Sequence, residues 1–215
     1  MYDVANPLVN GEVYLSNFLE PKTKVLFDVG VEDYVYYLTN PGIMYHLFEP
    51  VPDSFGSLKE KIKGMTNVIA NNYALGSEKG DKNFYFHGAS FIRRPGAREE
   101  NISVKVDTID NYISLNNINY VDFIKIDTEG WELEIIRGSV NSLDKISHIQ
   151  YEYGGTWKDG GYRLQQMVDI LIPKGYELFV IVPNGLVRVT DYQDHFQYCN
   201  YFATRKAEEI QAIIR

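Results

Sequence analysis

The chain has 215 residues, a formal net charge of −8 and a pI near 5.0. This length fits one well-buried core, and we expect residues 1–215 to form a single domain. Nucleic acids and anionic membranes select for clustered Lys and Arg, so this acidic chain is expected to bind neither. A small molecule, uncharged or cationic, is the partner class that the charge favours.

The single cysteine, Cys199, has no partner in this chain for a disulfide, and no Cys/His spacing indicates a zinc site. The first 15 residues lack the basic start and apolar core of a signal peptide. Apolar runs are all shorter than the roughly 18 residues needed to span a bilayer. We therefore expect a soluble, cytoplasmic protein with no membrane span.

Strand-like apolar runs alternate with helical patterns along most of the chain, which predicts a mostly parallel sheet with helices on both faces. One predicted helix, over 54–63, carries Phe55, Leu58 and Ile62 at helical spacing. Seven runs are predicted to be strands: 25–29, 44–48, 67–70, 121–126, 148–153, 176–182 and 197–204.

Two segments depart from this alternation. Too few residues separate the last two strands for a crossover helix, so the seventh strand should run antiparallel to the sixth. Residues 82–106 contain two β-like stretches around RRPGAREE, and we interpret them as an inserted hairpin near the mouth of the sheet. Such an insertion either decorates the fold or covers a substrate.

Polar residues follow the first three strands, where ligands bind in open parallel sheets. The first strand ends in Asp28 and Gly30, and the second ends in Glu49. A carboxylate at the second position is placed to accept hydrogen bonds from both ribose hydroxyls of a nucleoside cofactor, or else it stabilises the start of the next helix. Asn72, after the third strand, offers an amide to an adenine edge.

The fourth strand and its loop read IKIDTEGWE, and this stretch gives the strongest indication of a functional site. Lys125 and Asp127 lie on the same side of a strand that should be buried, so they are expected to neutralise each other. Asp127, Glu129 and, from the fifth strand, Glu152 point toward one crevice. Three carboxylates at adjacent strand ends indicate a functional site.

Several of these stretches together resemble the FkbM-type methyltransferases: VLFDVG, LFEPVPDSF, NNYALGSEKG, VDTID and VDFIKIDTEGWELEIIRGS followed by IQYEY. Members of that family use S-adenosylmethionine, have the Rossmann-like class I methyltransferase fold and mostly methylate hydroxyl groups, often on sugars. The resemblance implies cofactor contacts at Asp28, Gly30, Glu49 and Asn72. It also implies that Asp127 lies near the methionine part of the cofactor or the reacting methyl group.

The opening loop DVGVEDYVYYL departs from the family pattern. A second glycine is usual where this chain has Tyr34, and tyrosine suits neither a close backbone approach nor a positive φ. S-adenosylmethionine carries no pyrophosphate, so its loop needs a less close backbone approach than the loop of a dinucleotide site. We therefore expect that one glycine suffices and that the chain binds this cofactor. Glu32 or Asp33 is expected to face the cofactor's ammonium group.

The expected function is O-methylation of a saccharide hydroxyl in glycan biosynthesis, with a small-molecule or glycan acceptor. Asp127 and Glu152 are the expected catalytic residues, acting either as a base or as ligands of a Mg²⁺ ion that acidifies the hydroxyl. Tyr153, Trp157 and Tyr162 either form an apolar platform for a sugar ring or pack in the core.

Two other functions remain open. The missing glycines suggest a methyltransferase fold that has lost catalysis and serves as a binding or assembly module. NAD-dependent oxidoreduction is disfavoured because the chain has no G-x-G-x-x-G motif.

Overall fold

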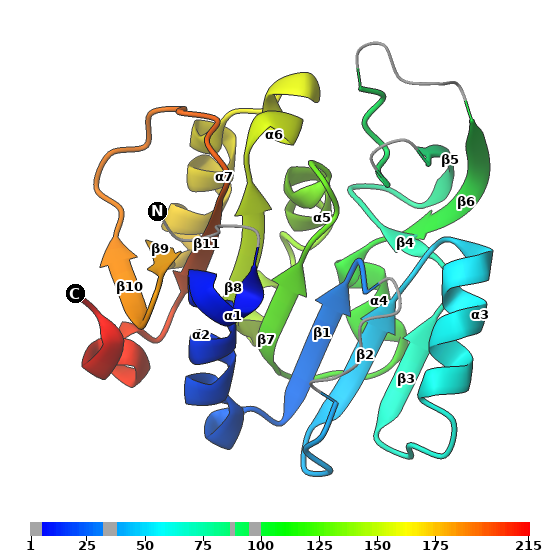
Figure 1. Ribbon diagram of the computed structural model, residues 1–215, viewed down its shortest axis with the longest axis horizontal. Helices are drawn as coiled ribbons and strands as arrows, with labels where there is room; N and C mark the ends of the chain where they lie inside the picture. The colour runs from blue at the N-terminus through cyan, green and yellow to red at the C-terminus, as the bar shows by residue number, and fades with distance from the viewer. Residues whose placement is uncertain (1–5, 32–37, 87–88, 95–99) are drawn as a thin grey trace.

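A computed structural model describes residues 6–31, 38–86, 89–94 and 100–215 of the chain. Its centre is an eight-stranded sheet with the order β10-β9-β11-β8-β7-β1-β2-β3 (Figure 1). The strands of this sheet are β1 Val25–Val29, β2 Met44–Phe48, β3 Val68–Asn71, β7 Val121–Ile126, β8 Ile146–Tyr153, β9 Glu177–Val182, β10 Gly185–Arg188 and β11 Cys199–Thr204.

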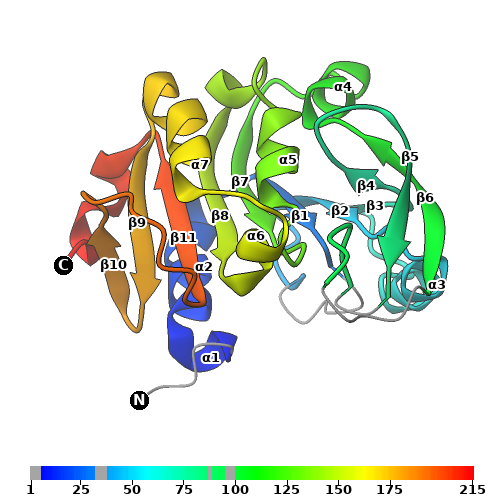
Figure 2. The ribbon, with the colours of Figure 1, turned by 90° about the horizontal axis from the view of Figure 1, so that it is seen from above.

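Helices cover both faces of the sheet, as Figure 2 shows from above. They are α1 Pro7–Asn10, α2 Glu12–Leu19, α3 Pro52–Lys61, α4 Ile109–Leu115, α5 Glu132–Arg137, α6 Gly155–Asp159 and α7 Leu164–Leu171. Short 3₁₀ segments are η1 Glu20–Lys22, η2 Leu143–Lys145, η3 Ile172–Lys174 and η4 Ala207–Ile213. The mostly parallel α/β architecture is thus as the alternating sequence pattern predicts.

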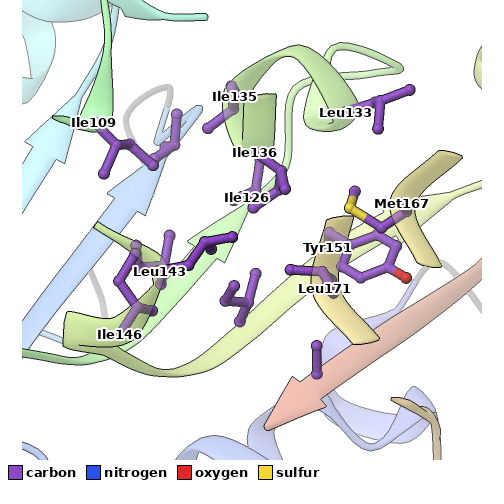
Figure 3. Close-up of a cluster of buried hydrophobic side chains, with 14 of the residues drawn as sticks. Ile109, Ile126, Leu133, Ile135, Ile136, Leu143, Ile146, Tyr151, Met167 and Leu171 are labelled. Atoms are coloured by element: carbon purple, nitrogen blue, oxygen red, sulfur yellow. The ribbon is translucent and has the colours of Figure 1, made fainter. Parts of the chain in front are cut away.

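Successive side chains of β7 face opposite sides of the sheet and pack in separate core layers. Ile124 and Ile126 belong to the large cluster beneath α4, α5 and α7, part of which is drawn in Figure 3. Phe123 points to the other face, where it packs with Leu15 and Leu19 of α2. Because successive side chains of a strand face opposite sides, Lys125 shares the α2 face with Phe123.

The sheet has eight strands rather than the predicted seven. β11 runs antiparallel to β9, as predicted, but it also pairs with β8 and so lies between them. The additional strand is β10, which folds back on β9 through the turn at Pro183 and Asn184. In the sequence, the residues after this turn indicate only a connection too short for a crossover helix. A tight turn needs few residues, and Asn184, after Pro183, adopts the left-handed conformation (φ 60°).

A second, three-stranded sheet stands beside the first at its carboxyl edge (Figure 1). It contains β4 Ala74–Leu75, β5 Gly80–Tyr85 and β6 Asn101–Asp107. β5 and β6 pair antiparallel across the segment that the sequence suggested as a hairpin. This sheet therefore brings the insertion close to the ends of the parallel strands.

Candidate active site

A large cavity lies where β1, β2 and β7 end, and it continues beneath α2. We call it the strand-end cavity. Its volume is about 730 Å³, within the range of small-molecule sites. Its polar lining includes Asp28, Glu49, Lys125, Asp127 and Gln150. Asp28, Glu49 and Asp127, three of the residues expected at the strand ends, thus surround one space.

At the end of β1, Gly30 is required by the backbone. Its φ is +89°, and a Cβ atom there would lie 1.9 Å from the backbone oxygen of Asp127. Glycine therefore lets the β1 loop pack directly against the end of β7. Asp28, two residues earlier, is buried, and one of its carboxylate oxygens lies 4.0 Å from Lys125 Nζ. Glu32, Asp33 and Tyr34 lie outside the described residues.

At the end of β2, Glu49 is buried and lines the strand-end cavity. Its Oε1 accepts a hydrogen bond from the backbone N–H of Val51 at 2.7 Å, next to the start of α3. Asn72 is exposed and does not line this cavity. Its Nδ2 donates to the carbonyls of Glu49 and Pro50 at 3.0 and 3.2 Å, so Asn72 braces the loop that carries Glu49.

At the end of β7, Lys125 and Asp127 form the expected ion pair, with Nζ and Oδ2 3.0 Å apart. Burial lowers the pKa of Lys125, but the carboxylates of Asp127, Asp28 and Glu12 outweigh burial and raise it overall. The pKa of Asp127 is lowered by Lys125 despite burial. Both groups are therefore charged at neutral pH, and Asp127, whose side chain is 43% exposed, faces the cavity.

Glu152 at the end of β8 behaves differently from Asp127. Burial and, after it, the carboxylates of Asp127, Glu129 and Glu132 raise the pKa of Glu152 to about 10. The side chain hydrogen-bonds to Asp127. At neutral pH Glu152 is therefore a protonated acid that donates to Asp127, rather than a carboxylate ready to take a proton.

Asp127 and Glu152 do not form a metal site with a third ligand. Among the residues that the structure describes, no three His, Cys, Asp or Glu side chains are grouped so that they could hold an ion. The ammonium of Lys125 lies against Asp127 and Asp28 and supplies the positive charge that Mg²⁺ would have brought. The predicted Mg²⁺ has no support in this geometry.

Glu132 is a residue whose role the sequence did not reveal. It is fully buried, and its Oε1 accepts from the backbone N–H groups of Thr128 and Gly130 and from the Thr128 hydroxyl. Its Oε2 accepts from Trp157 Nε1 at 2.9 Å. These contacts hold the 127–130 loop in a strained shape in which Glu129 has a φ of +55°.

The insertion contributes Arg94 to this loop. One guanidinium nitrogen of Arg94 lies 2.6 Å from a carboxylate oxygen of Glu129. The two residues line a second, smaller cavity of about 370 Å³ together with Glu152, Thr156 and Tyr198. Tyr198 and Glu129 also line the strand-end cavity, so the two cavities are neighbours.

The aromatic residues Tyr153, Trp157 and Tyr162 do not form a platform for a ligand. Tyr153 and Trp157 are fully buried in the core beneath α7, and Tyr162 packs against them. The aromatic rings that line the strand-end cavity include Phe91 of the insertion and Trp131 beside α5, whose ring centroids are 5.0 Å apart. Neither His46 nor His148 lines either cavity, and burial lowers the pKa of each to about 4.

The methyltransferase FkbM domain model matches residues 24–178, which is most of the chain. The chain belongs to the FkbM methyltransferase family. A curated relative, Hexuronic acid methyltransferase AglP of Haloferax volcanii, is 30% identical over 110 residues, covering 49% of this chain. The match covers 45% of the length of that relative.

Solved structures agree with this membership at the level of the fold. The FkbM methyltransferase of Methylobacillus flagellatus KT superposes with a TM-score of 0.52 at 15% identity, over 84% of this chain and 43% of its own. An rRNA methylase of Streptococcus thermophilus gives 0.52 at 11% identity, over 94% and 98% of the two chains. SMU.1697c of Streptococcus mutans, solved in complex with SAH, gives 0.51 at 9% identity, over 90% and 97%. The class I methyltransferase fold is therefore confirmed.

No helix within residues 6–31, 38–86, 89–94 and 100–215 combines the length and the apolar character needed to cross a bilayer.

Proposed function

We propose that this FkbM family member is an S-adenosylmethionine-dependent O-methyltransferase that acts on a hydroxyl group of a sugar or glycan. The observation that carries the proposal is the strand-end cavity, in which Asp28, Glu49 and Asp127 end three neighbouring strands. Carboxylates suit a cofactor that has both a sulfonium and an ammonium group.

The cavity fits the cofactor in its other parts as well. Glu49 is the residue for the ribose hydroxyls, because its carboxylate is buried at the end of β2 and lines the cavity. Phe48, Ala74 and Leu75 offer an apolar surface for the adenine ring. Gly30 keeps the β1 loop close to β7, so the methionine part would lie between Asp28 and Asp127.

When bound, S-adenosylmethionine supplies a methyl group activated by the positive sulfur. Asp127 would accept a hydrogen bond from the acceptor hydroxyl and take its proton as the hydroxyl oxygen receives the methyl group. Lys125 holds Asp127 in place through its 3.0 Å contact. The protonated carboxyl group of Glu152 donates to Asp127 and helps to hold its carboxylate in place.

A sugar acceptor is supported by the relative that acts on hexuronic acid, although the match spans less than half of that protein. The rRNA methylase shares only the fold, and at 11% identity its substrate does not transfer to this chain. The net charge of −8 also disfavours an RNA acceptor.

Methyl transfer tests the proposal directly. The protein is incubated with S-adenosylmethionine labelled in the methyl group and with a panel of hexosides and hexuronides, and labelled glycoside is measured. We expect labelled glycoside with native protein and at least a hundredfold less with Asp127→Asn. Label in RNA but in no glycoside would contradict the sugar assignment.

A further inference from the structure

Gln150, in the middle of β8, has a side-chain oxygen that the fold does not use. The residue is 2% exposed and lines the strand-end cavity. Its Nε2 donates to Glu12 Oε2 at 2.7 Å. A carboxylate only accepts hydrogen bonds, so this contact fixes the amide orientation and turns Oε1 away from Glu12. Among the described residues, Oε1 has no hydrogen-bond partner.

Buried amide oxygens are rarely left without a donor, because burial removes the water that would otherwise satisfy them. Glu152 lies two residues further along the same strand face, and its Oε2 is likewise buried without a partner among the described residues. Residues i and i+2 of a strand point to the same side, so the two oxygens form a row along β8. Gln150 lines the strand-end cavity and Glu152 lines its smaller neighbour.

Glu12 of α2 completes this surface beside Gln150. It lines the same cavity as Gln150, and its Oε1 accepts from Asn200 Nδ2 at 2.9 Å. We call Glu12, Gln150 and Glu152 the β8 subsite. Gln150 Oε1 and the Glu12 carboxylate can only accept hydrogen bonds, so the subsite suits a ligand rich in hydroxyl donors.

We propose that the β8 subsite binds the polyhydroxylated part of the acceptor, with Gln150 Oε1 accepting a hydrogen bond from a hydroxyl group that is not methylated. The assignment of this ligand as the acceptor rests on the proposed function. Gln150 pairs in register with Lys125, two residues before Asp127, so Gln150 lies deeper along the sheet face than the reacting group, whereas Glu152 lies beside Asp127. A ring seated there would have another of its hydroxyls within reach of Asp127.

Ligand-observed NMR with protein saturated with S-adenosylhomocysteine tests this assignment, with methyl β-glucopyranoside and methyl β-glucuronide as probes. Gln150→Met keeps the size of the side chain and removes the acceptor. We expect both probes to bind native protein and Gln150→Met to weaken both by about tenfold or more, the loss typical of one buried hydrogen bond. The affinity for S-adenosylhomocysteine should not change.

Asn200→Ala is the matched control. It also removes one amide donor to Glu12, but Asn200 lines neither cavity. We expect it to lower the melting temperature about as much as Gln150→Met and to bind both probes like native protein. If Gln150→Met does not fold, Gln150→Asn withdraws the same oxygen by one methylene and is expected to act in the same direction.

Three results would overturn the subsite: equal probe affinity of native and Gln150→Met protein, a loss seen in S-adenosylhomocysteine affinity instead, or failure of native protein to bind either probe. Failure of the proposed function gives a different pattern. Binding of the glycosides that depends on Gln150, without any methyl transfer, would refute the transferase and leave the subsite standing.

Discussion

The ammonium of Lys125 lies 3.0 Å from the carboxylate of Asp127 and 4.0 Å from that of Asp28. One half-buried cation thus joins the ends of β1 and β7, on the wall of the strand-end cavity. This arrangement has two consequences: Asp127 stays charged, and its loss leaves Lys125 with a remaining carboxylate nearby.

Asp127→Asn should therefore fold. We expect it to lose roughly 1 to 3 kcal/mol of unfolding free energy, less than for a buried charge left wholly alone, because Asp28 remains. Its turnover should fall by about a hundredfold or more, since the asparagine amide cannot take the proton of the acceptor hydroxyl. Urea unfolding and initial rates measure the two effects separately. A stable variant with near-native turnover would remove Asp127 from catalysis.

Glu49 has a structural contact and a proposed ligand contact that two variants separate. Glu49→Ala loses both, and we expect S-adenosylmethionine binding to weaken by about 1.5 to 3 kcal/mol. Glu49→Gln keeps an oxygen that can accept from the Val51 N–H, but it lacks the charge and one acceptor for the ribose. It should fold like native protein and still bind more weakly. Calorimetric affinities equal to native in both variants would leave Glu49 with only its helix-start role.

Gly30 and Gly64 have nearly the same φ, +89° and +87°, but different surroundings. A Cβ at Gly64 meets nothing within 4 Å, whereas one at Gly30 would meet the Asp127 carbonyl oxygen at 1.9 Å. Gly64→Ala should cost about 1 kcal/mol from its backbone conformation alone. Gly30→Ala should cost clearly more and abolish cofactor binding, because the β1 loop must move away from β7. Similar stability losses in the two variants would show that the contact with Asp127 is unimportant.

Glu152 makes stability depend on pH. Its pKa is raised from 4.5 to about 10 in the folded protein, so the folded state binds a proton that the unfolded state has released between these values. The free energy of unfolding should therefore fall as the pH rises through this window, by up to about 1.4 kcal/mol per pH unit from this group. Glu152→Gln keeps the shape without the titration and should flatten the curve. Denaturation at pH 6, 7.5 and 9 compares the slopes, and equal slopes would contradict the raised pKa.

The sequence predicted the parts of the site that depend on strand order. Asp28, Glu49 and Asp127 each follow an apolar run, and the ends of parallel strands meet at one edge, so their convergence could be inferred. The Lys125 and Asp127 pair followed from their spacing on one strand face. β10 was missed because a hairpin strand needs little apolar sequence.

Contacts between distant segments could not be inferred in this way. Glu12 meets Gln150 across 138 positions of the chain, and nothing in either local pattern marks the contact. Arg94 lies in the insertion, and no periodicity in the sequence there predicts its ion pair with Glu129. The protonated state of Glu152 depends on burial and on three neighbouring carboxylates, which only the assembled fold brings together.

Titration of the native protein with S-adenosylmethionine in a calorimeter tests the central claim most directly, because every proposed role depends on the strand-end cavity holding this cofactor. We predict one site per chain with a dissociation constant in the range of roughly 1 μM to 1 mM, as is usual for enzyme ligands. Saturating S-adenosylhomocysteine should abolish the signal by competition. Absence of binding by correctly folded native protein would contradict the account and favour a methyltransferase fold that serves as a binding or assembly module.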